Sequence, residues 1–353
     1  MRFLRPIAFG LVLAASILPV SAIAGSFTGL YVLGDSLSDQ GNLYSATSIL
    51  GPGLGQPAQP AADHYFNGRF SNGPVYTEQL AYDLGLSVTA SELGGNNFAF
   101  GGARTDYNTV EAPPFGDQVY PRATFPWSLN AERAAFTTRF GAGADPNALY
   151  VVFSGSNDIT DIVRRRLDPA VTIANTVSGV INTIDAFKAA GAKTVLVPNL
   201  PDLGVVPRVT ALGPRVAVLA TDLVSQYNDA LSVALRQETG IHVVQFDTFD
   251  FIRDVALNPT KYGFGNSTQA CYSGFVLPDP TGTVCSNPNE YVFWDSEHPT
   301  TRFHALLGDA MFDAVVPEPG SLWLIASGLA ALAAWRRRFS RSTLCVIAQG
   351  GRP

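Results

Sequence analysis

Five short apolar runs recur along this 353-residue chain, and each has the length of a single buried strand. The runs lie at 29–34, 96–101, 148–154, 193–198 and 241–246. Helix-like segments separate or follow them, near 75–84, 128–139, 170–190, 213–238 and 300–314. Strands that alternate with helices predict a parallel sheet with helices on both faces. We therefore expect an α/β fold, a three-layer α/β/α sandwich around a central, mostly parallel five-stranded sheet.

The residues that follow the first apolar run point to chemistry. Gly34-Asp35-Ser36 ends the run abruptly and places the Ser36 hydroxyl at the carboxyl end of a strand, where sites form in open α/β sheets. A glycine permits a tight exit from the strand at little cost. The same residues are also typical of a turn with a helix N-cap. The pattern is compatible with a serine nucleophile or with an ordinary turn, and the choice depends on a base elsewhere in the chain.

A candidate base lies in the segment Trp-Asp-Ser-Glu-His-Pro-Thr at 294–300. A serine hydroxyl is a weak nucleophile at neutral pH and needs an adjacent base, which a third group holds in the correct tautomer. Asp295 precedes His298 by three residues, so one loop supplies both groups. The remaining histidines lie in an aromatic-rich loop, an apolar strand and a probable helix: His64, His242 and His304. Asp-x-x-His is also a common turn, and no second pair with ligand spacing favours a metal site.

Two further segments supply hydrogen-bond donors for an oxyanion. The run at 97–105 ends in Gly101-Gly102, and the run from Val151 continues into Gly-Ser-Asn-Asp at 155–158. Acyl transfer needs preorganised donors aimed at the developing negative charge. The backbone N–H of Gly102 and the side-chain amide of Asn157 are suitable donors. Alone, each segment is equally compatible with a turn or a helix cap.

In this order, the four segments resemble the Ser, Gly, Asn and His blocks of the SGNH (GDSL) hydrolase family, over residues 27–316. The resemblance implies a flavodoxin-like SGNH hydrolase fold. It implies that Ser36 is the nucleophile, that its backbone N–H is a third oxyanion donor, and that Asp295 and His298 complete the triad. Gly102 and Asn157 match the oxyanion residues. The Gly-x-Ser-x-Gly elbow of α/β-hydrolases is absent from the sequence, which argues against that fold.

Residues 1–24 resemble a secretory signal peptide, with Arg2 and Arg5 before an apolar core at 7–20 and Ala-Ile-Ala before the predicted cleavage site. A short membrane anchor is the alternative interpretation. The mature domain is expected at 25–316. The apolar content of the whole chain is ample for a core, and its net charge of −6 argues against a nucleic-acid partner, which requires a basic face.

The opposite end carries Pro-Glu-Pro at 317–319, an apolar run at 321–335 and three arginines at 336–338. Fifteen residues span roughly 22 Å as a helix, less than the ~30 Å hydrocarbon core, so that crossing requires flanking residues or local thinning. The segment 317–338 resembles the PEP-CTERM sorting signal of Gram-negative bacteria. That resemblance implies that the protein is retained in the inner membrane until a sorting enzyme removes the tail. The three arginines are expected on the cytoplasmic side. A buried C-terminal helix is the alternative, and residues 339–353 are an atypical extension.

Cys271 and Cys285 lie fourteen residues apart in a loop rich in Gly, Pro and Asn, where they are candidates for a disulfide or for two unpaired thiols. Two segments, 103–127 and 247–293, are too long for plain connections, and long ordered loops are usually functional. Their aromatic residues are expected either to line a cleft or to anchor the loops to the domain: Phe125, Trp127, Tyr262, Phe264 and Phe275.

These observations predict an exported esterase or lipase that hydrolyses carboxylic esters through a Ser-His-Asp triad and an acyl-enzyme, with no metal or organic cofactor. The expected partners are a lipid or acylated-sugar ester and the enzyme that processes the C-terminal signal. A polysaccharide O-acetylesterase of the same family is one alternative. A surface or matrix protein with an idle site is another.

Overall fold

The computed structural model describes residues 27–50, 58–106, 109–112, 116–119, 127–276, 279, 281–316, 328, 329 and 332. The predicted signal peptide and nearly all of the predicted tail lie outside these residues. Residues Phe27–Pro317 form one structural unit. Its strands are β1 (Leu30–Gly34), β2 (Thr109–Ala112), β3 (Gly116–Val119), β4 (Leu149–Phe153), β5 (Thr194–Pro198), β6 (His242–Phe246), β7 (Asn266–Ala270) and β8 (Tyr291–Phe293). Its α-helices are α1 (Asn42–Leu50), α2 (Tyr76–Asp83), α3 (Leu129–Phe140), α4 (Ser156–Arg165), α5 (Pro169–Ala190), α6 (Pro207–Thr210), α7 (Pro214–Leu235), α8 (Thr248–Leu257) and α9 (Thr301–Val315).

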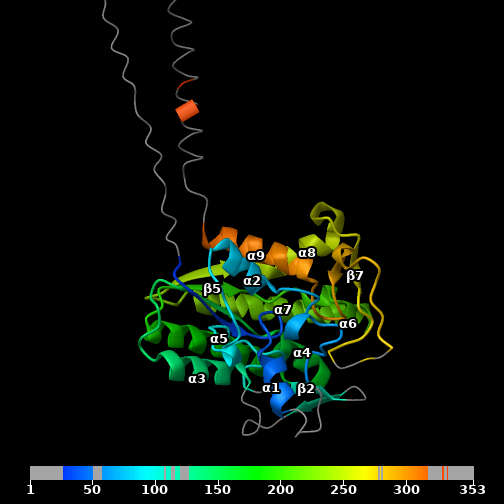
Figure 1. Cartoon of the computed structure of the whole chain (residues 1–353), viewed down its shortest axis with the longest axis horizontal. Coiled ribbons are helices and arrows are strands. Elements are labelled where there is room, and N and C mark those ends of the chain that lie inside the picture. Colours follow the sequence, from blue (N-terminus) through cyan, green and yellow to red (C-terminus); the bar gives the residue numbers. More distant parts are fainter. Residues whose placement is uncertain are drawn as a thin grey trace, which may run out of the picture. The chain divides into compact units, whose positions relative to one another are not determined.

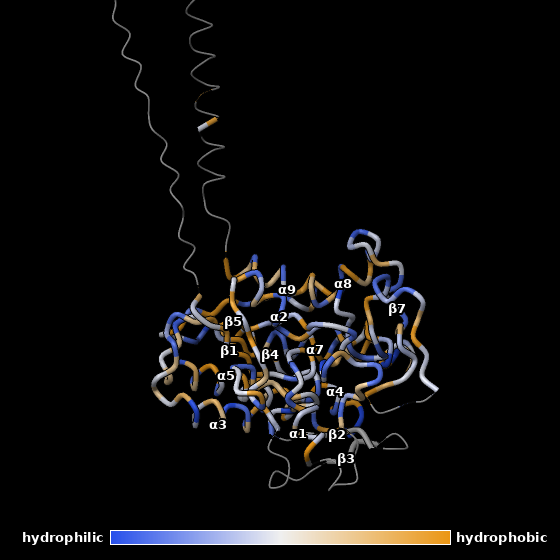
Figure 2. Tube along the Cα trace, viewed as in Figure 1, coloured by the Kyte–Doolittle hydropathy of each residue, from blue (hydrophilic) through white to orange (hydrophobic). Residues whose placement is uncertain are grey.

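The central sheet is parallel, with the strand order β1-β4-β5-β6. β1 and β4 consist of buried residues throughout, as expected for strands covered on both faces. α2, α8 and α9 lie on one side of this sheet and α3, α5 and α7 on the other (Figure 1). Figure 2 shows hydrophobic residues concentrated along β1 and β5, inside the layers of helices. The predicted α/β class and its three layers are therefore confirmed.

The sheet has four assigned strands among the described residues, whereas five were predicted. The segment 96–101 does run beside β1 in parallel, because Phe98 and Phe100 donate backbone hydrogen bonds to the carbonyls of Val32 and Gly34. Its intervening N–H groups bond to side chains: Ala99 N–H to Asn97 Oδ1, and Gly101 N–H to Asp39 Oδ2. The segment thus lies at the sheet edge as an extended chain that the bridge from Val32 to Asn97 joins to β1.

Local sequence explains where the longer helices begin and end. Asp168 caps α5 by accepting the backbone N–H of Val171, Pro169 occupies its first turn, and Gly191 ends it in a left-handed conformation. Thr300 caps α9 by accepting the N–H of Phe303. Because α9 begins directly after the segment that holds Asp295 and His298, its packing against α2 fixes the position of that segment.

Candidate active site

The first predicted site residue lies where β1 ends. Gly34 passes so close to the Phe153 carbonyl of the neighbouring strand β4 that a Cβ atom there would collide with it. Only glycine therefore fits at this exit, and the chain then turns through Asp35 to Ser36, which is half-buried. Asp35 is buried beneath Ser36, and burial raises the pKa of its carboxyl to about 7. The carboxyl accepts the N–H of Leu37, which shapes the turn.

Ser36, His298 and Asp295 form a continuous hydrogen-bonded chain. The Oγ atom of Ser36 lies 3.0 Å from His298 Nε2, and His298 Nδ1 lies 2.8 Å from Asp295 Oδ2. Asp295 Oδ1 accepts the backbone N–H groups of Glu297 and His298 at 2.8 and 2.6 Å. These backbone bonds hold the carboxylate in the plane needed to orient the imidazole. The three residues that the sequence singled out are thus brought together from positions 262 residues apart.

Asp295 and His298 shift each other's pKa in opposite directions. Burial disfavours the charged imidazole, but the Asp295 carboxylate more than compensates, so the pKa of His298 is raised above its ordinary value. For Asp295, burial opposes ionisation, but His298 and the hydrogen bonds to the carboxylate lower its pKa overall. His298 is therefore a stronger base than a free histidine, as a group that must take a proton from serine requires.

Gly102 and Asn157 line the same open cleft as Ser36 and His298, which has an empty volume of about 470 Å³. Gly102 has a φ of 75°, a conformation that favours glycine. Asn157 lies in the first turn of α4, directly beyond β4, and its Nδ2 donates to the Ala103 carbonyl at 3.1 Å. This bond fixes the amide and uses one of its two N–H groups, so one donor remains.

The loop that carries Gly102 is fastened to α4 by buried charges. The Arg104 guanidinium forms two bonds with Asp161, at 3.0 and 3.1 Å, and donates to the Gly102 carbonyl at 2.7 Å. Asp158 accepts the backbone N–H of Thr105 with both of its oxygens at 3.1 Å. Because Asn157 lies on the same helix as Asp158 and Asp161, these contacts fix the two candidate donors relative to each other.

A buried glutamate joins the serine loop to the glycine loop. Glu132 of α3 accepts the N–H of Gly34 at 2.9 Å and that of Phe100 at 3.2 Å. Burial raises its pKa well above the ordinary value, and only the two backbone bonds oppose this. Nothing in the local sequence of α3 marks Glu132, because its partners lie 98 and 32 residues away.

Tyr65 is a second residue that the sequence gave no reason to single out. Its hydroxyl is buried and donates to Asp295 Oδ2 at 2.6 Å, so that this oxygen receives bonds from both Tyr65 and His298. Tyr65 is 230 residues from Asp295 in the chain. It precedes the Arg-Phe-Ser-Asn-Gly stretch at 69–73, and only the fold brings it to the triad.

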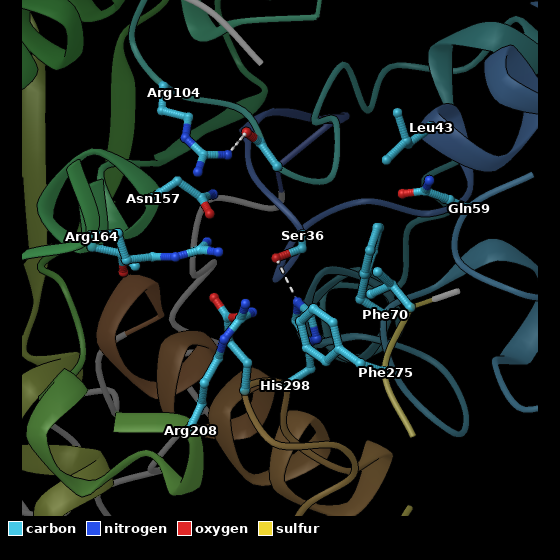
Figure 3. A pocket seen from close by; sticks show the side chains of 14 residues that line it. Ser36, Leu43, Gln59, Phe70, Arg104, Asn157, Arg164, Arg208, Phe275 and His298 are labelled. Carbon is cyan, nitrogen blue, oxygen red and sulfur yellow. Dashed lines mark hydrogen bonds and ion pairs between the residues drawn. The ribbon is translucent and has the colours of Figure 1, made fainter. Parts of the chain in front are cut away.

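Aromatic rings flank His298 on two sides. The Phe275 ring stacks on the imidazole at 5.8 Å with an interplanar angle of 19°, and Phe70 lies 5.0 Å away. The Arg208 guanidinium lies over the Phe275 ring, 4.6 Å from its centroid, and donates to Glu297 at 2.7 Å. The two rings and the arginine together restrict the imidazole to an orientation that faces Ser36. Figure 3 shows Phe70 and Phe275 on the opposite side of Ser36 from Asn157 and Arg164.

Of the aromatic residues predicted to line the cleft, only Phe275 does so among the described residues. Trp127 stacks on Phe100, Phe264 is buried in the core, and Tyr262 packs near Phe251, so these three anchor their loops. Phe125 lies outside the described residues. The loop that carries Phe275 is closed by a disulfide between Cys271 and Cys285.

The other three histidines lie apart from the triad. His304 is buried in α9, where its Nδ1 accepts the N–H of Tyr76 and burial lowers its pKa to about 3. His64 stacks on Tyr272 at 4.3 Å, and His242 is exposed on β6. Across the described ranges, no group of three or more His, Cys, Asp or Glu side chains has the geometry of a metal site.

Comparison with known proteins identifies the chain. Residues 30–311 match the family model for GDSL-like lipase/acylhydrolase, and residues 315–338 match the PEP-CTERM protein-sorting motif. The chain is 27% identical to a GDSL esterase/lipase of Arabidopsis thaliana, over 79% of this chain and 87% of the relative. It is 25% identical to the phosphatidylcholine-sterol acyltransferase of Aeromonas hydrophila, over 80% of this chain and 89% of the relative.

A third relative and a solved structure complete the comparison. The esterase EstA of Pseudomonas aeruginosa is 28% identical over 91% of this chain, but the match spans only 52% of that longer protein. An acetylxylan esterase structure from Geobacillus stearothermophilus superposes with a TM-score of 0.39 and 12% identity, covering 82% of this chain and 94% of that one. The family model spans most of the sequence. The chain is therefore a carboxylic ester hydrolase that belongs to the GDSL-like lipase/acylhydrolase family and carries a PEP-CTERM sorting motif.

Proposed function

We propose that this hydrolase acts through a Ser-His-Asp triad of Ser36, His298 and Asp295 and through a covalent acyl-enzyme. The observation that carries the proposal is the hydrogen-bonded chain from Ser36 Oγ to His298 to Asp295, at 3.0 and 2.8 Å, at the wall of an open cleft. Serine, histidine and aspartate in this order are the three parts that nucleophilic acyl transfer requires.

In the first half-reaction, Ser36 Oγ attacks the ester carbonyl carbon while its proton passes to His298 Nε2. The carbonyl oxygen becomes an oxyanion, which the backbone N–H groups of Ser36 and Gly102 and the free amide N–H of Asn157 stabilise. Collapse of this intermediate breaks the bond to the alcohol oxygen, which takes the proton from His298. Asp295 keeps its negative charge and stabilises the imidazolium.

In the second half-reaction, a water molecule occupies the place of the alcohol. His298 removes a proton from the water, whose oxygen attacks the acyl carbon, and the proton then returns to Ser36 Oγ as the carboxylic acid leaves. Tyr65 takes no part in proton transfer. Its hydrogen bond keeps negative charge on the Asp295 oxygen that faces His298.

A covalent probe tests the assignment directly. A fluorophosphonate, which phosphonylates activated serines with loss of fluoride, should label the full-length protein once, and peptide mapping should place the adduct on Ser36. Pretreatment with an ester substrate should slow the labelling. Labelling at another serine, with Ser36 unmodified and esterase activity lost, would rule out Ser36 as the nucleophile.

The pH dependence of kcat/KM should follow the protonation of His298. The His298 ring must be neutral to accept the serine proton, so kcat/KM should fall as the pH drops through the pKa of His298. Because that pKa is raised, the acid limb should lie above the value of about 6.5 expected for a free histidine. Asp295→Asn removes the carboxylate charge and should move the limb to lower pH. A limb that stays in place in this variant would contradict the role given to Asp295.

We further propose that residues 1–24 direct export and that 317–338 hold the catalytic domain, 25–316, at the periplasmic face of the inner membrane until a sorting enzyme releases it. The matched sorting motif at 315–338 supports this proposal. Among the residues that the structure describes, none forms a helix long and apolar enough to cross a membrane. The segment 317–338 lies almost entirely outside them, and fractionation tests its role.

Removal of residues 317–353 should convert a membrane-associated protein into a soluble, active one in a Gram-negative host. The physical reason is that α9 ends at Val315, and every proposed catalytic residue lies before it. Immunoblots and esterase assays of membrane and periplasmic fractions provide the measurement. Recovery of the full-length chain wholly in the soluble periplasm would show that the segment is not an anchor. Loss of folding in the truncated chain would show that the domain extends past residue 316.

A further inference from the structure

A second hollow opens beside the catalytic cleft, between α4, α6 and α7, with an empty volume of about 940 Å³. Most of the side chains that line it are aliphatic, among them Val163, Leu203, Val209, Leu212 and Val216. Leu212 is 62% exposed, so the hollow is open to solvent and forms a groove rather than a sealed core void. An apolar groove of this kind favours an apolar occupant, because burial of each methylene removes it from water.

The groove is continuous with the catalytic cleft. Thr160, Arg164 and Arg208 line both hollows, and Thr160 lies one turn along α4 from Asn157. The guanidinium of Arg208 contacts Glu297 and Phe275, which line the cleft and not the groove, so its aliphatic stem faces the groove. The Arg164 side chain extends towards Ser36 in Figure 3. A ligand that passes from Ser36 along α4 therefore enters the groove between two arginine stems.

The proposed mechanism determines which part of an ester points there. The alcohol oxygen must lie near His298, because that residue protonates it as it leaves. The acyl group must then point away from His298, across Ser36. Phe70 and Phe275 lie on the His298 side, whereas Asn157 and Arg164 lie on the other side, towards the groove (Figure 3).

On this basis, which rests on the proposed function, we propose that the groove between α4, α6 and α7 binds the aliphatic acyl chain of the substrate. The substrate class is thus esters of medium or long straight-chain fatty acids. Among the described residues, no aromatic side chain lines the groove, and its walls therefore offer no ring face of the kind on which sugars stack. A smaller cavity behind Ser36 is walled by Phe293, Phe303 and Leu307, all of them core residues that support the triad, and it offers less room.

A matched pair of substitutions on one helix tests the proposal. Val216→Trp at the start of α7 places an indole in the groove, and Val233→Trp makes the same change at an exposed position of the same helix. The assay measures kcat/KM with 4-nitrophenyl esters from acetyl to dodecanoyl, so that the alcohol stays constant. In the wild type, each added methylene should raise kcat/KM by about fourfold until the groove is filled, which corresponds to ~0.8 kcal/mol.

We expect Val216→Trp to lower the ratio of decanoyl to acetyl kcat/KM by at least about tenfold, because closing two methylene positions at about fourfold each gives roughly sixteenfold. Acetyl ester hydrolysis should stay within about twofold of the wild type, which also shows that the variant is folded. Val233→Trp should leave the whole profile unchanged. A profile in Val216→Trp that matches the control, or an equal loss for all esters, would overturn the groove assignment.

The outcomes also separate this inference from the proposed mechanism. If the wild type hydrolyses acetyl esters but shows no rise with chain length, the groove assignment fails and the triad stands. A second series uses acetyl esters of alcohols of increasing length. If Val216→Trp lowers kcat/KM more for the longer alcohols than for the shorter ones, the groove holds the alcohol, and the acyl assignment is wrong. If the wild type hydrolyses no ester, the proposed function is wrong, and the groove assignment that rests on it is wrong as well.

Discussion

Ser36→Ala should reduce kcat for ester hydrolysis by roughly 10⁶-fold, the scale observed when the nucleophile of a serine hydrolase triad is removed. The reason is that no acyl-enzyme can form without the Oγ atom that lies 3.0 Å from His298. The alanine variant keeps the cleft and the candidate oxyanion donors, so a small residual acceleration should remain. Single-turnover assays with an acetyl ester measure the loss.

The fold should survive this change, because Ser36 is half-buried and its hydroxyl bonds to the His298 ring rather than to the backbone. The melting temperature should therefore stay close to that of the wild type. Ser48→Ala is the matched control, since it removes an exposed hydroxyl from α1 and should leave kcat unchanged. Turnover by Ser36→Ala at a rate near that of the control would exclude Ser36 as the nucleophile.

Asn157→Ala should lower kcat by roughly 10²–10³-fold and leave KM nearly constant, which is the magnitude for the loss of one oxyanion donor. The amide is fixed by its bond to the Ala103 carbonyl, so its remaining N–H is already oriented before the charge develops. A donor that strengthens its bond only in the transition state affects kcat and kcat/KM equally.

Asn258→Ala is the control for this prediction. Asn258 also donates its amide to a protein oxygen, Asp254 Oδ1, but it does not line the cleft. Its removal should leave both kinetic constants unchanged. If Asn157→Ala instead raises KM and preserves kcat, the amide binds the ground state of the ester, and its assignment as an oxyanion donor is wrong.

The layers of the fold could be predicted because each buried strand is an apolar run bounded by turn residues and several helices begin at a capping residue, as α3, α5, α8 and α9 do. The edge segment 96–101 could not be resolved in this way, because its pairing depends on distant side chains. Asp39 and Asn97 accept N–H groups that a further strand would otherwise have paired, and an apolar run gives no indication of this.

The residues of the site likewise fall into those that local sequence indicates and those that only the tertiary structure reveals. Ser36, Gly102, Asn157, Asp295 and His298 lie within short motifs, so local sequence indicated them. Tyr65 and Glu132 have only long-range partners and no motif, so they emerged from the structure. The loop aromatics could not be assigned to cleft or core from the sequence for a related reason: a Phe or Tyr is equally suited to either place, and only the tertiary contacts decide between the two.

The carboxylates that join the loops have a consequence for redesign. Glu132, Asp158 and Asp161 bond the serine loop, the glycine loop and α4 to one another through buried contacts, whereas Val209, Leu212 and Val216 line the adjoining groove. Changes to these carboxylates affect two loops and α4 at once, but changes to the three aliphatic residues affect only the groove wall. A mutant library aimed at new ester preferences should therefore vary Val209, Leu212 and Val216 and keep the three carboxylates fixed. Substrate selectivity can then change while the geometry of Ser36 and His298 is retained.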